Sequence, residues 1–228
     1  MPATTDSFTG FRPEAIQFLA DLAANNERAW FQPRKGDYER LLKEPLEALC
    51  VALADRFAAE GLPLSADPNR SPFRIYRDVR FSKDKSPYKT NIGAAFRWTG
   101  EGEGDPGGYF HLEPGEAFVG GGMWHPEKAS LDAFRRTLDT DPGRIHAVID
   151  DPDFVRTFGH INGDRLTRVP QGFDKDHPEA ELLKLKDMTF GHRLSDADVY
   201  SADLPDRLVA SLTKAVPVMR MLATLPVS

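Results

Sequence analysis

Apolar residues recur every three or four positions in the first quarter of the chain, which predicts two helices. The first begins near Pro13, a residue suited to a first helical turn, and carries the apolar positions Phe11, Ala15, Phe18, Leu19 and Leu22. The second carries Tyr38, Leu42, Leu46, Leu49, Leu53 and Phe57. It is expected to end at Gly61 and Pro63, and Pro45 is expected to kink or divide it.

The period changes to two in the middle of the chain, which predicts antiparallel strands. Ile92, Ala94, Phe96 and Trp98 alternate with smaller or polar residues, and residues 108–124 read as a hairpin that turns at Pro114 and Gly115. Residues 99–108 ("TGEGEGDPGG") offer little to bury, so we expect them to form a mobile loop.

Helical spacing returns after Pro126, in a helix bearing Leu131, Phe134 and Leu138, with shorter helices expected near 145–149 and 154–158. Residues 160–178 are rich in turn formers, 188–194 predict a further strand, and a last helix is expected from Asp203 to Met219. The order predicts an α+β fold: a single domain over residues 1–228, with a central, mostly antiparallel sheet flanked by helices. Residues 1–9 are expected to be a flexible N-terminus.

Composition narrows the function classes. The chain has 228 residues, a net charge of −6 and a single cysteine, Cys50, within an apolar run. The acidic balance disfavours broad attachment to nucleic acid, which would have to rely on a local basic face. No signal-peptide pattern and no run of about twenty apolar residues is visible, so we expect a cytoplasmic protein with no membrane partner.

One stretch departs from this acidic background. Residues 73–91 ("FRIYRDVRFSKDKSPYKTN") contain six basic side chains and two aspartates, while the remaining 209 residues carry a net charge of −10. Residues 73–81 alternate like a strand that turns Phe73, Ile75, Val79 and Phe81 towards a core. This register also turns Arg77 inward, where a guanidinium needs an anionic partner.

The stretch predicts an anion-binding site, and the expected ligand is a phosphate-bearing small molecule. Arginines offer a planar fork for two-point contact with an oxyanion, and lysines add point charges on flexible stems. The candidate binding residues are Arg74, Arg77, Arg80, Lys83, Lys85 and Lys89, with Tyr76, Asp78 and Tyr88 orienting them. Whether such a site is catalytic stays open, and the residues assign no catalytic group and no cofactor.

Two other interpretations stay open. In the first, the same residues belong to a non-enzymatic module that docks an acidic protein or a nucleic-acid backbone. Alternatively, the cations pair only with the protein's own carboxylates and form a structural ion-pair cluster. The stretch contains neither a GxxxxGK[ST] loop nor a GxGxxG motif that would indicate a nucleotide site.

Other residue types add weaker candidates. The six histidines have no zinc-site spacing, so no metal is expected, although His111 could reach the arginine face and act as an acid or base. Gly120, Gly121 and Gly122 favour close approach of another backbone or a bulky ring over anion binding. No serine lies in a GxSxG or SxxK pattern, and Asp78 and Asp84 fit salt bridges better than a nuclease metal site.

Four blocks resemble one known family. They are "NNERAWF" at 25–31, "RIYRDVRFSKDKSPYKTN" at 74–91, "GGGMWHPE" at 120–127 and "VPQGFDKDHPEAELLKLK" at 169–186. In order and spacing they resemble DUF2461, a family of mainly bacterial proteins, over nearly the whole chain. The resemblance implies one domain, and it implies no activity, substrate or cofactor.

Overall fold

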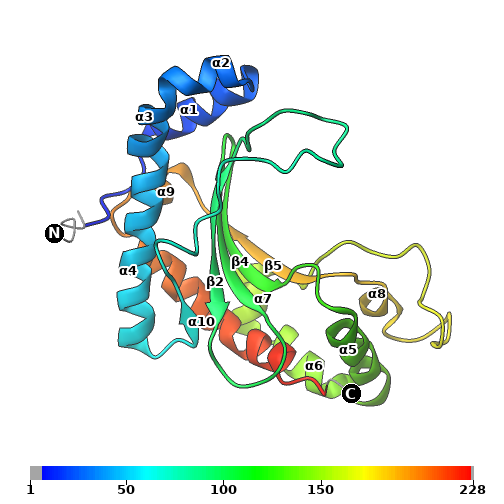
Figure 1. The fold of residues 1–228 in the computed structure, drawn as a ribbon. Coiled ribbons are helices and arrows are strands. Elements are labelled where there is room, and N and C mark those ends of the chain that lie inside the picture. Colours follow the sequence, from blue (N-terminus) through cyan, green and yellow to red (C-terminus); the bar gives the residue numbers. More distant parts are fainter. Residues whose placement is uncertain (1–6, 227–228) are drawn as a thin grey trace.

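The computed structural model describes residues 7–226, which form helices around an antiparallel sheet (Figure 1). The strands are β1 (Leu64–Ser65), β2 (Ile92–Trp98), β3 (Gly107–Glu113), β4 (Glu116–Met123) and β5 (Met188–Arg193). The helices are α1 (Pro13–Ala24), α2 (Arg28–Phe31), α3 (Lys35–Tyr38), α4 (Glu44–Glu60), α5 (Lys128–Thr140), α6 (Pro142–Ile149), α7 (Pro152–Phe158), α8 (Ala180–Leu183), α9 (Asp196–Tyr200) and α10 (Leu204–Ala223). This architecture confirms the predicted α+β class.

Within the described residues the sheet has five strands in the order β1-β2-β3-β4-β5, and every neighbouring pair is antiparallel. The predicted hairpin is confirmed: β3 and β4 pair up to Glu113 and Glu116, so Pro114 and Gly115 form the turn. Gly115 has φ +84°, a left-handed conformation that glycine adopts without strain.

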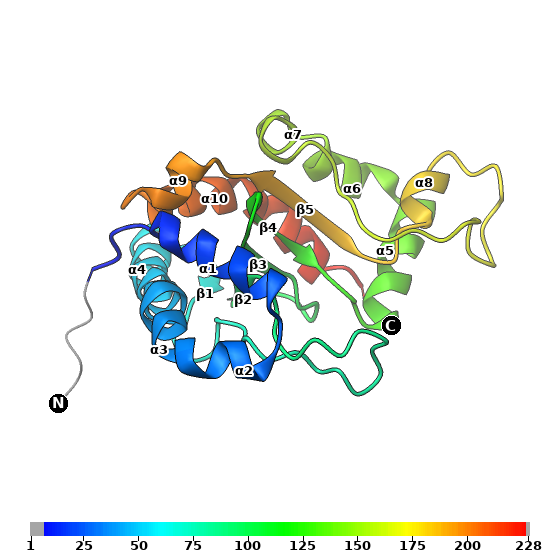
Figure 2. The same ribbon diagram turned by 90° about the horizontal axis from the view of Figure 1, so that it is seen from above.

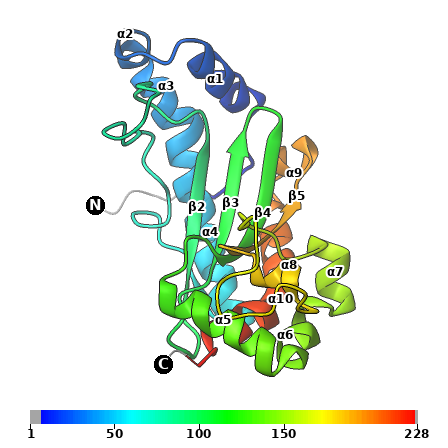
Figure 3. The ribbon, with the colours of Figure 1, turned by 90° about the vertical axis from the view of Figure 1, so that its right-hand side faces the viewer.

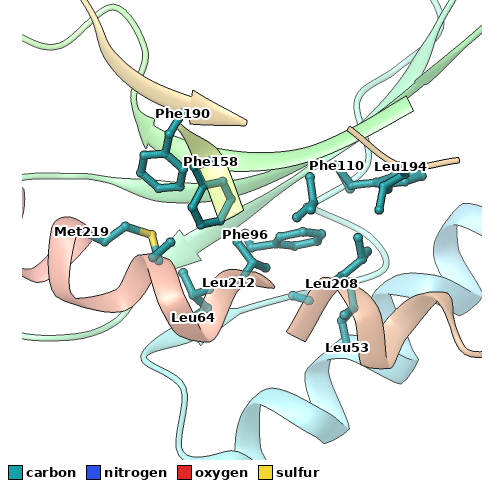
Figure 4. Packing of buried hydrophobic residues seen from close by; sticks show 14 of the residues in the cluster. Leu53, Leu64, Phe96, Phe110, Phe158, Phe190, Leu194, Leu208, Leu212 and Met219 are labelled. Atoms are coloured by element: carbon teal, nitrogen blue, oxygen red, sulfur yellow. The ribbon is translucent and has the colours of Figure 1, made fainter. Parts of the chain in front are cut away.

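One face of the sheet packs on α10 and α4, and this layer holds the core (Figure 4). Because strand side chains alternate, Phe96 and Phe110 point into this layer and are fully buried. Leu208 and Leu212 of α10 and Leu53 of α4 meet them from the helices. Each such side chain contributes roughly 1.5–3 kcal/mol through burial, so this face is fixed by packing.

The helices also divide into two groups around the sheet. Figure 2 shows α1 to α4 on one side of the molecule and α5 to α8 on the other. Seen from the side opposite the core layer, β2, β3 and β4 face the viewer with α4 and α10 behind them (Figure 3). The second face of the sheet is therefore not covered by those two long helices.

The second helix was expected to be kinked or divided at Pro45, and it changes helix type just before this residue without a break. A π-helical segment, η2 (Glu39–Lys43), leads directly into α4, and Pro45 lies in the first turn of α4. A proline ring lacks the N–H that an uninterrupted helix would need at this point, and the wider π turn accommodates that loss. Another short turn, the 3₁₀ helix η1 (Gln32–Arg34), joins α2 to α3.

Residues 73–81 do not form the predicted strand. The segment is extended but irregular, with isolated bridges from Pro72 to Ala94 and from Tyr76 to Tyr88. Ile75 is buried as expected, whereas Phe81 is 95% exposed. The alternation was misleading because the partner of this segment is residues 87–89, a short run that offers only a few backbone hydrogen bonds.

Two further expectations need correction. The 99–108 loop is packed, because the backbone N–H of Gly104 donates to Ala223 O and the indole Nε1 of Trp98 donates to Glu101 O. Of the N-terminal segment expected to be flexible, residues 1–6 lie outside the described residues. Phe8, by contrast, is buried and packs edge-to-face on Phe11, with ring centroids 5.6 Å apart.

Among residues 7–226, no helix combines the length and the apolar character needed to cross a bilayer.

Candidate functional site

A groove of about 830 Å³ lies on the sheet face opposite α10. The strand register arranges its floor in rows across β2 to β5. The rows are Gly93, His111, Phe118 and Arg193; then Ala95, Tyr109, Gly120 and Gly191; then Arg97, Gly107, Gly122 and Thr189. Adjacent rows are about 7 Å apart, since they are two residues apart along each strand. Trp124, one row further along, closes the far end.

Most positions in the middle of the floor carry no side chain or only a methyl group. Five of the eight positions in the second and third rows are glycine or alanine: Ala95, Gly107, Gly120, Gly122 and Gly191. A ligand can therefore approach the sheet backbone there.

Three of these glycines are required by packing, since a Cβ at Gly107 would also lie 2.8 Å from Phe96 O, and two of them confirm the close approach predicted for the glycine run. A Cβ atom at Gly120 would lie 2.2 Å from Phe190 O, and one at Gly122 would lie 2.0 Å from Met188 O. Both carbonyls belong to β5. Larger residues at these two positions would therefore prevent β4 and β5 from lying as close together as they do. At Gly191 a Cβ would meet only ordinary contacts, at 3.6 Å and 3.9 Å.

Aromatic and polar side chains gather at the other end of the groove. The Tyr109 ring covers Gly93, and its centroid lies 6.0 Å from that of Phe73 and 5.7 Å from that of Phe118. His111 stacks on Phe118 with centroids 4.9 Å apart. Burial, with a smaller contribution from Glu113, raises the pKa of Tyr109 to about 12, so this phenol is neutral and can donate a hydrogen bond.

Contacts within the protein fix the buried His111. Its Nδ1 lies 3.3 Å from Asn91 Nδ2 and 3.0 Å from Tyr109 Oη. An amide nitrogen only donates, so Nδ1 is the acceptor and the neutral ring carries its proton on Nε2, 3.6 Å from Glu113 Oε2. His111 is thus on the predicted sheet face, where it is already engaged by protein groups.

One of the predicted cations, Lys89, lies at this end of the groove, and a second, Arg74, is near enough to act on its charge without lining the groove. Lys89 lines the groove, with Nζ 5.0 Å from the centre of the Phe73 ring. Its pKa is lowered, first by burial and then by the positive charge of Arg74. Neither cation has a carboxylate within 4 Å among residues 7–226. Two repelling cations without such a partner favour an added anion.

The remaining predicted arginines are paired locally. Arg77 donates to Asp84, and the side chain of Arg77 is 30% exposed. Arg80 donates to both carboxylate oxygens of Asp78, at 2.9 Å and 2.7 Å. These hydrogen bonds lower the pKa of Asp78 to about 2 and hold that of Asp84 well below its usual range.

Three other predicted residues also have defined positions. Lys85 Nζ donates to Val79 O at 2.9 Å, so this ammonium group forms a hydrogen bond within its own loop. Lys83 is exposed and does not line the groove. Tyr76 is 46% exposed, and its ring centroid lies 5.5 Å from that of Tyr88.

Tyr88 anchors the segment in the core. It is 1% exposed and stacks on Phe31 with centroids 4.1 Å apart. Its backbone N–H donates to Asn26 Oδ1 at 3.0 Å, and its carbonyl accepts from Asn26 Nδ2 at 2.9 Å. The neighbouring Lys89 is thereby held at a fixed place on the groove wall.

Residues without a role assigned from sequence lie at the far end of the groove and beside it. Trp124 is 75% exposed, and its ring centroid lies 4.1 Å from that of His125. The backbone N–H of His125 donates to Asp187 Oδ1 at 2.6 Å. Asp187 is 3% exposed. Only the block "GGGMWHPE" pointed to this region, without indicating chemistry.

A family model described as "Conserved hypothetical protein (DUF2461)" matches residues 14–221. The chain belongs to this family. No curated protein and no solved structure matches the chain. The family model gives no activity, so function has to be argued from the groove.

Proposed function

We propose that this DUF2461 protein binds a phosphate-bearing or otherwise anionic small molecule in the groove. The observation that carries the proposal is Lys89 on the groove wall with Arg74 near it, two cations without a carboxylate within 4 Å among residues 7–226, beside a floor with glycine or alanine at five of its eight middle positions. Lys89 would contact the anionic group. Phe73, Tyr109 and Phe118 would contact the remainder of the ligand, as aromatic side chains commonly do in ligand pockets.

The proposal narrows the original set of binding residues. Arg77 and Arg80 each have an aspartate partner, so these pairs favour the structural ion-pair interpretation for the loop tip. Arg74 and Lys89 are the members of the set that the proposal assigns to the ligand. We further propose that the protein works in the bacterial cytoplasm, which is supported by the family resemblance and by a buried, unpaired thiol at Cys50.

A screen by thermal shift tests the proposal. Pyrophosphate, nucleotides and sugar phosphates are compared with sodium chloride at equal ionic strength. A ligand at 100 times its Kd stabilises the folded state by about 2.7 kcal/mol. For a chain of this size that corresponds to a rise in Tm of roughly 5–10 °C.

The chain offers a matched control for this screen. Lys89→Gln should remove most of the shift, and Lys83→Gln should keep it, because both changes remove one positive charge from the same segment but only Lys89 lines the groove. The proposal fails if no anion raises Tm, or if the two variants lose the shift equally.

Docking of a macromolecule is a second candidate, favoured by one observation. Phe81 is 95% exposed at the loop tip, and the guanidinium of Arg80 lies 5.8 Å from the centre of its ring. An exposed aromatic beside basic residues suits an acidic protein or a nucleic-acid backbone. In this case Phe81→Ser should abolish binding of single-stranded oligonucleotides or acidic peptides, and affinity should fall steeply with salt.

A further inference from the structure

The backbone at His125 is strained. Within residues 7–226 it is the non-glycine residue with positive φ, at +50°. Side chains with a Cβ atom seldom adopt this conformation, and such strain is retained where the surroundings impose it, commonly at functional sites. Packing does not explain this strain, because the His125 side chain is 66% exposed.

Asp187 holds the backbone of His125 in this conformation by a hydrogen bond. Its side chain is 5% exposed, and Oδ1 accepts the backbone N–H of His125 at 2.6 Å. The same oxygen lies 3.6 Å from the ring Nδ1 of His125, slightly beyond hydrogen-bonding distance. Catalytic hydrogen bonds are often this long before a ligand binds. One buried carboxylate thus faces both the backbone and the ring of the same histidine.

This pair adjoins the end of the groove and does not itself line it. Trp124, the residue before His125, lines the groove, and so does Thr189, two residues after Asp187. Since Nδ1 is the ring nitrogen nearer the carboxylate, Nε2 is the nitrogen left available to a ligand, and it has no hydrogen-bond partner among the described residues. A buried aspartate behind an exposed imidazole is the arrangement that orients histidine for proton transfer.

We propose that His125 is an acid–base residue for a ligand bound in the groove, oriented by Asp187. The inference rests on the groove being the ligand site. Nε2 accepts a proton from a ligand hydroxyl or from water, which leaves an imidazolium beside the Asp187 carboxylate. The proton is then returned to an oxygen of the product, so the residue is restored and no oxidant or cofactor is consumed.

The first test measures the reactivity of the imidazole in the whole protein. Diethyl pyrocarbonate acylates the neutral imidazole, and mass spectrometry locates each modified histidine. We expect His125 to react several times faster than His160, an exposed histidine outside this pair. Asp187→Asn should reduce the rate at His125 and leave that at His160 unchanged. Equal rates at the two histidines in the unmodified sequence would overturn the proposal even if the variant did not fold.

The second test determines which ring nitrogen of neutral His125 carries the proton. A histidine that is exposed but has no orienting partner would not favour one nitrogen. Long-range proton–nitrogen NMR should show His125 with its neutral proton on Nδ1, facing Asp187, and His160 as a mixture. A mixture at His125 would contradict orientation by Asp187. Neither test uses a ligand, so their failure is distinguishable from failure of anion binding at Lys89.

A conservative variant separates chemistry from folding. His125→Asn should keep the Tm, because asparagine tolerates the left-handed region and retains the N–H that donates to Asp187. A large loss of Tm would assign the histidine ring to stability and contradict the proposed role.

Discussion

At the scale of single residues, the basic stretch resolves into charges that are neutralised locally and charges that are not. Arg80 pairs with Asp78 two positions away, and Arg77 pairs with Asp84 seven positions away. The sequence shows all four residues, but it cannot show that the loop folds back so that each aspartate reaches its arginine. Lys89 differs from these arginines in two ways: it has no carboxylate within 4 Å among the described residues, and the buried Tyr88 beside it fixes it on the groove wall.

The exposure of the Arg77–Asp84 pair limits its contribution to stability. Asp84 is 59% exposed, and exposed salt bridges contribute roughly 0–1 kcal/mol. Arg77→Ala should therefore lower the free energy of unfolding by less than about 1 kcal/mol, because the Asp84 carboxylate that loses its partner is hydrated by solvent. Urea denaturation measures this change. A loss of several kcal/mol would mean that Arg77 acts as a buried anchor.

Tyr109 should make stability depend on alkaline pH. Its pKa is raised to about 12 in the folded state, compared with about 10 in an unfolded chain. The folded state therefore retains the proton more strongly, and the resulting stability is present below pH 10 and is lost as pH rises towards 12. Tyr109→Phe should reduce this loss, measured by denaturation at several pH values. Tyr38, whose pKa is also raised to about 12, contributes in the same window and remains in the variant.

At the scale of elements, the spacing of hydrophobic residues was sufficient to predict a helix or strand wherever that element packs one face on the core. The spacing of Leu208 and Leu212 predicts α10, and the alternation of Ala94 and Phe96 predicts β2, because both patterns follow from one buried face. Residues 73–81 have the same kind of alternation and form no strand. Their pairing partner is a short irregular segment, which no local pattern reveals.

Helix α7 provides a test at this scale. The Asp151 side chain accepts the backbone N–H groups of Asp153 and Phe154, and thus caps the helix that carries Phe154 and Phe158 onto Phe190 of β5. Asp151→Ala should cost about 1 kcal/mol of unfolding free energy, the usual effect of losing such a cap. Asp153→Ala, in the same first turn, is the control and should cost less. Equal losses in chemical denaturation would show that charge, rather than the cap, stabilises α7.

At the scale of the whole molecule, the groove exists only once the sheet has assembled. Lys89, Tyr109, Phe118 and Trp124 come from three separate parts of the chain, and the register of four strands brings them to one face. The sequence could identify Lys89 as a candidate from local charge. It could not identify the bare floor, because that property depends on which residues lie side by side across β2 to β5.

The floor itself can be filled to test whether the groove binds the ligand. Gly191 lies in its second row, and a Cβ there meets only ordinary contacts, so Gly191→Leu should fold with unchanged or slightly higher stability. The leucine side chain would occupy space above the floor and exclude the ligand. We expect the thermal shift with the best anion of the screen to disappear.

Gly36→Leu provides the matched control, because Gly36 has nothing within 4 Å of a built Cβ and lies in α3, outside the groove. This variant should keep the full shift. If Gly191→Leu also keeps the shift while Lys89→Gln loses it, the anion sits on the wall beside Arg74 and not over the glycine floor. That result would also contradict the proposed role of His125, since the floor separates Lys89 from Trp124 by roughly 20 Å along the strands.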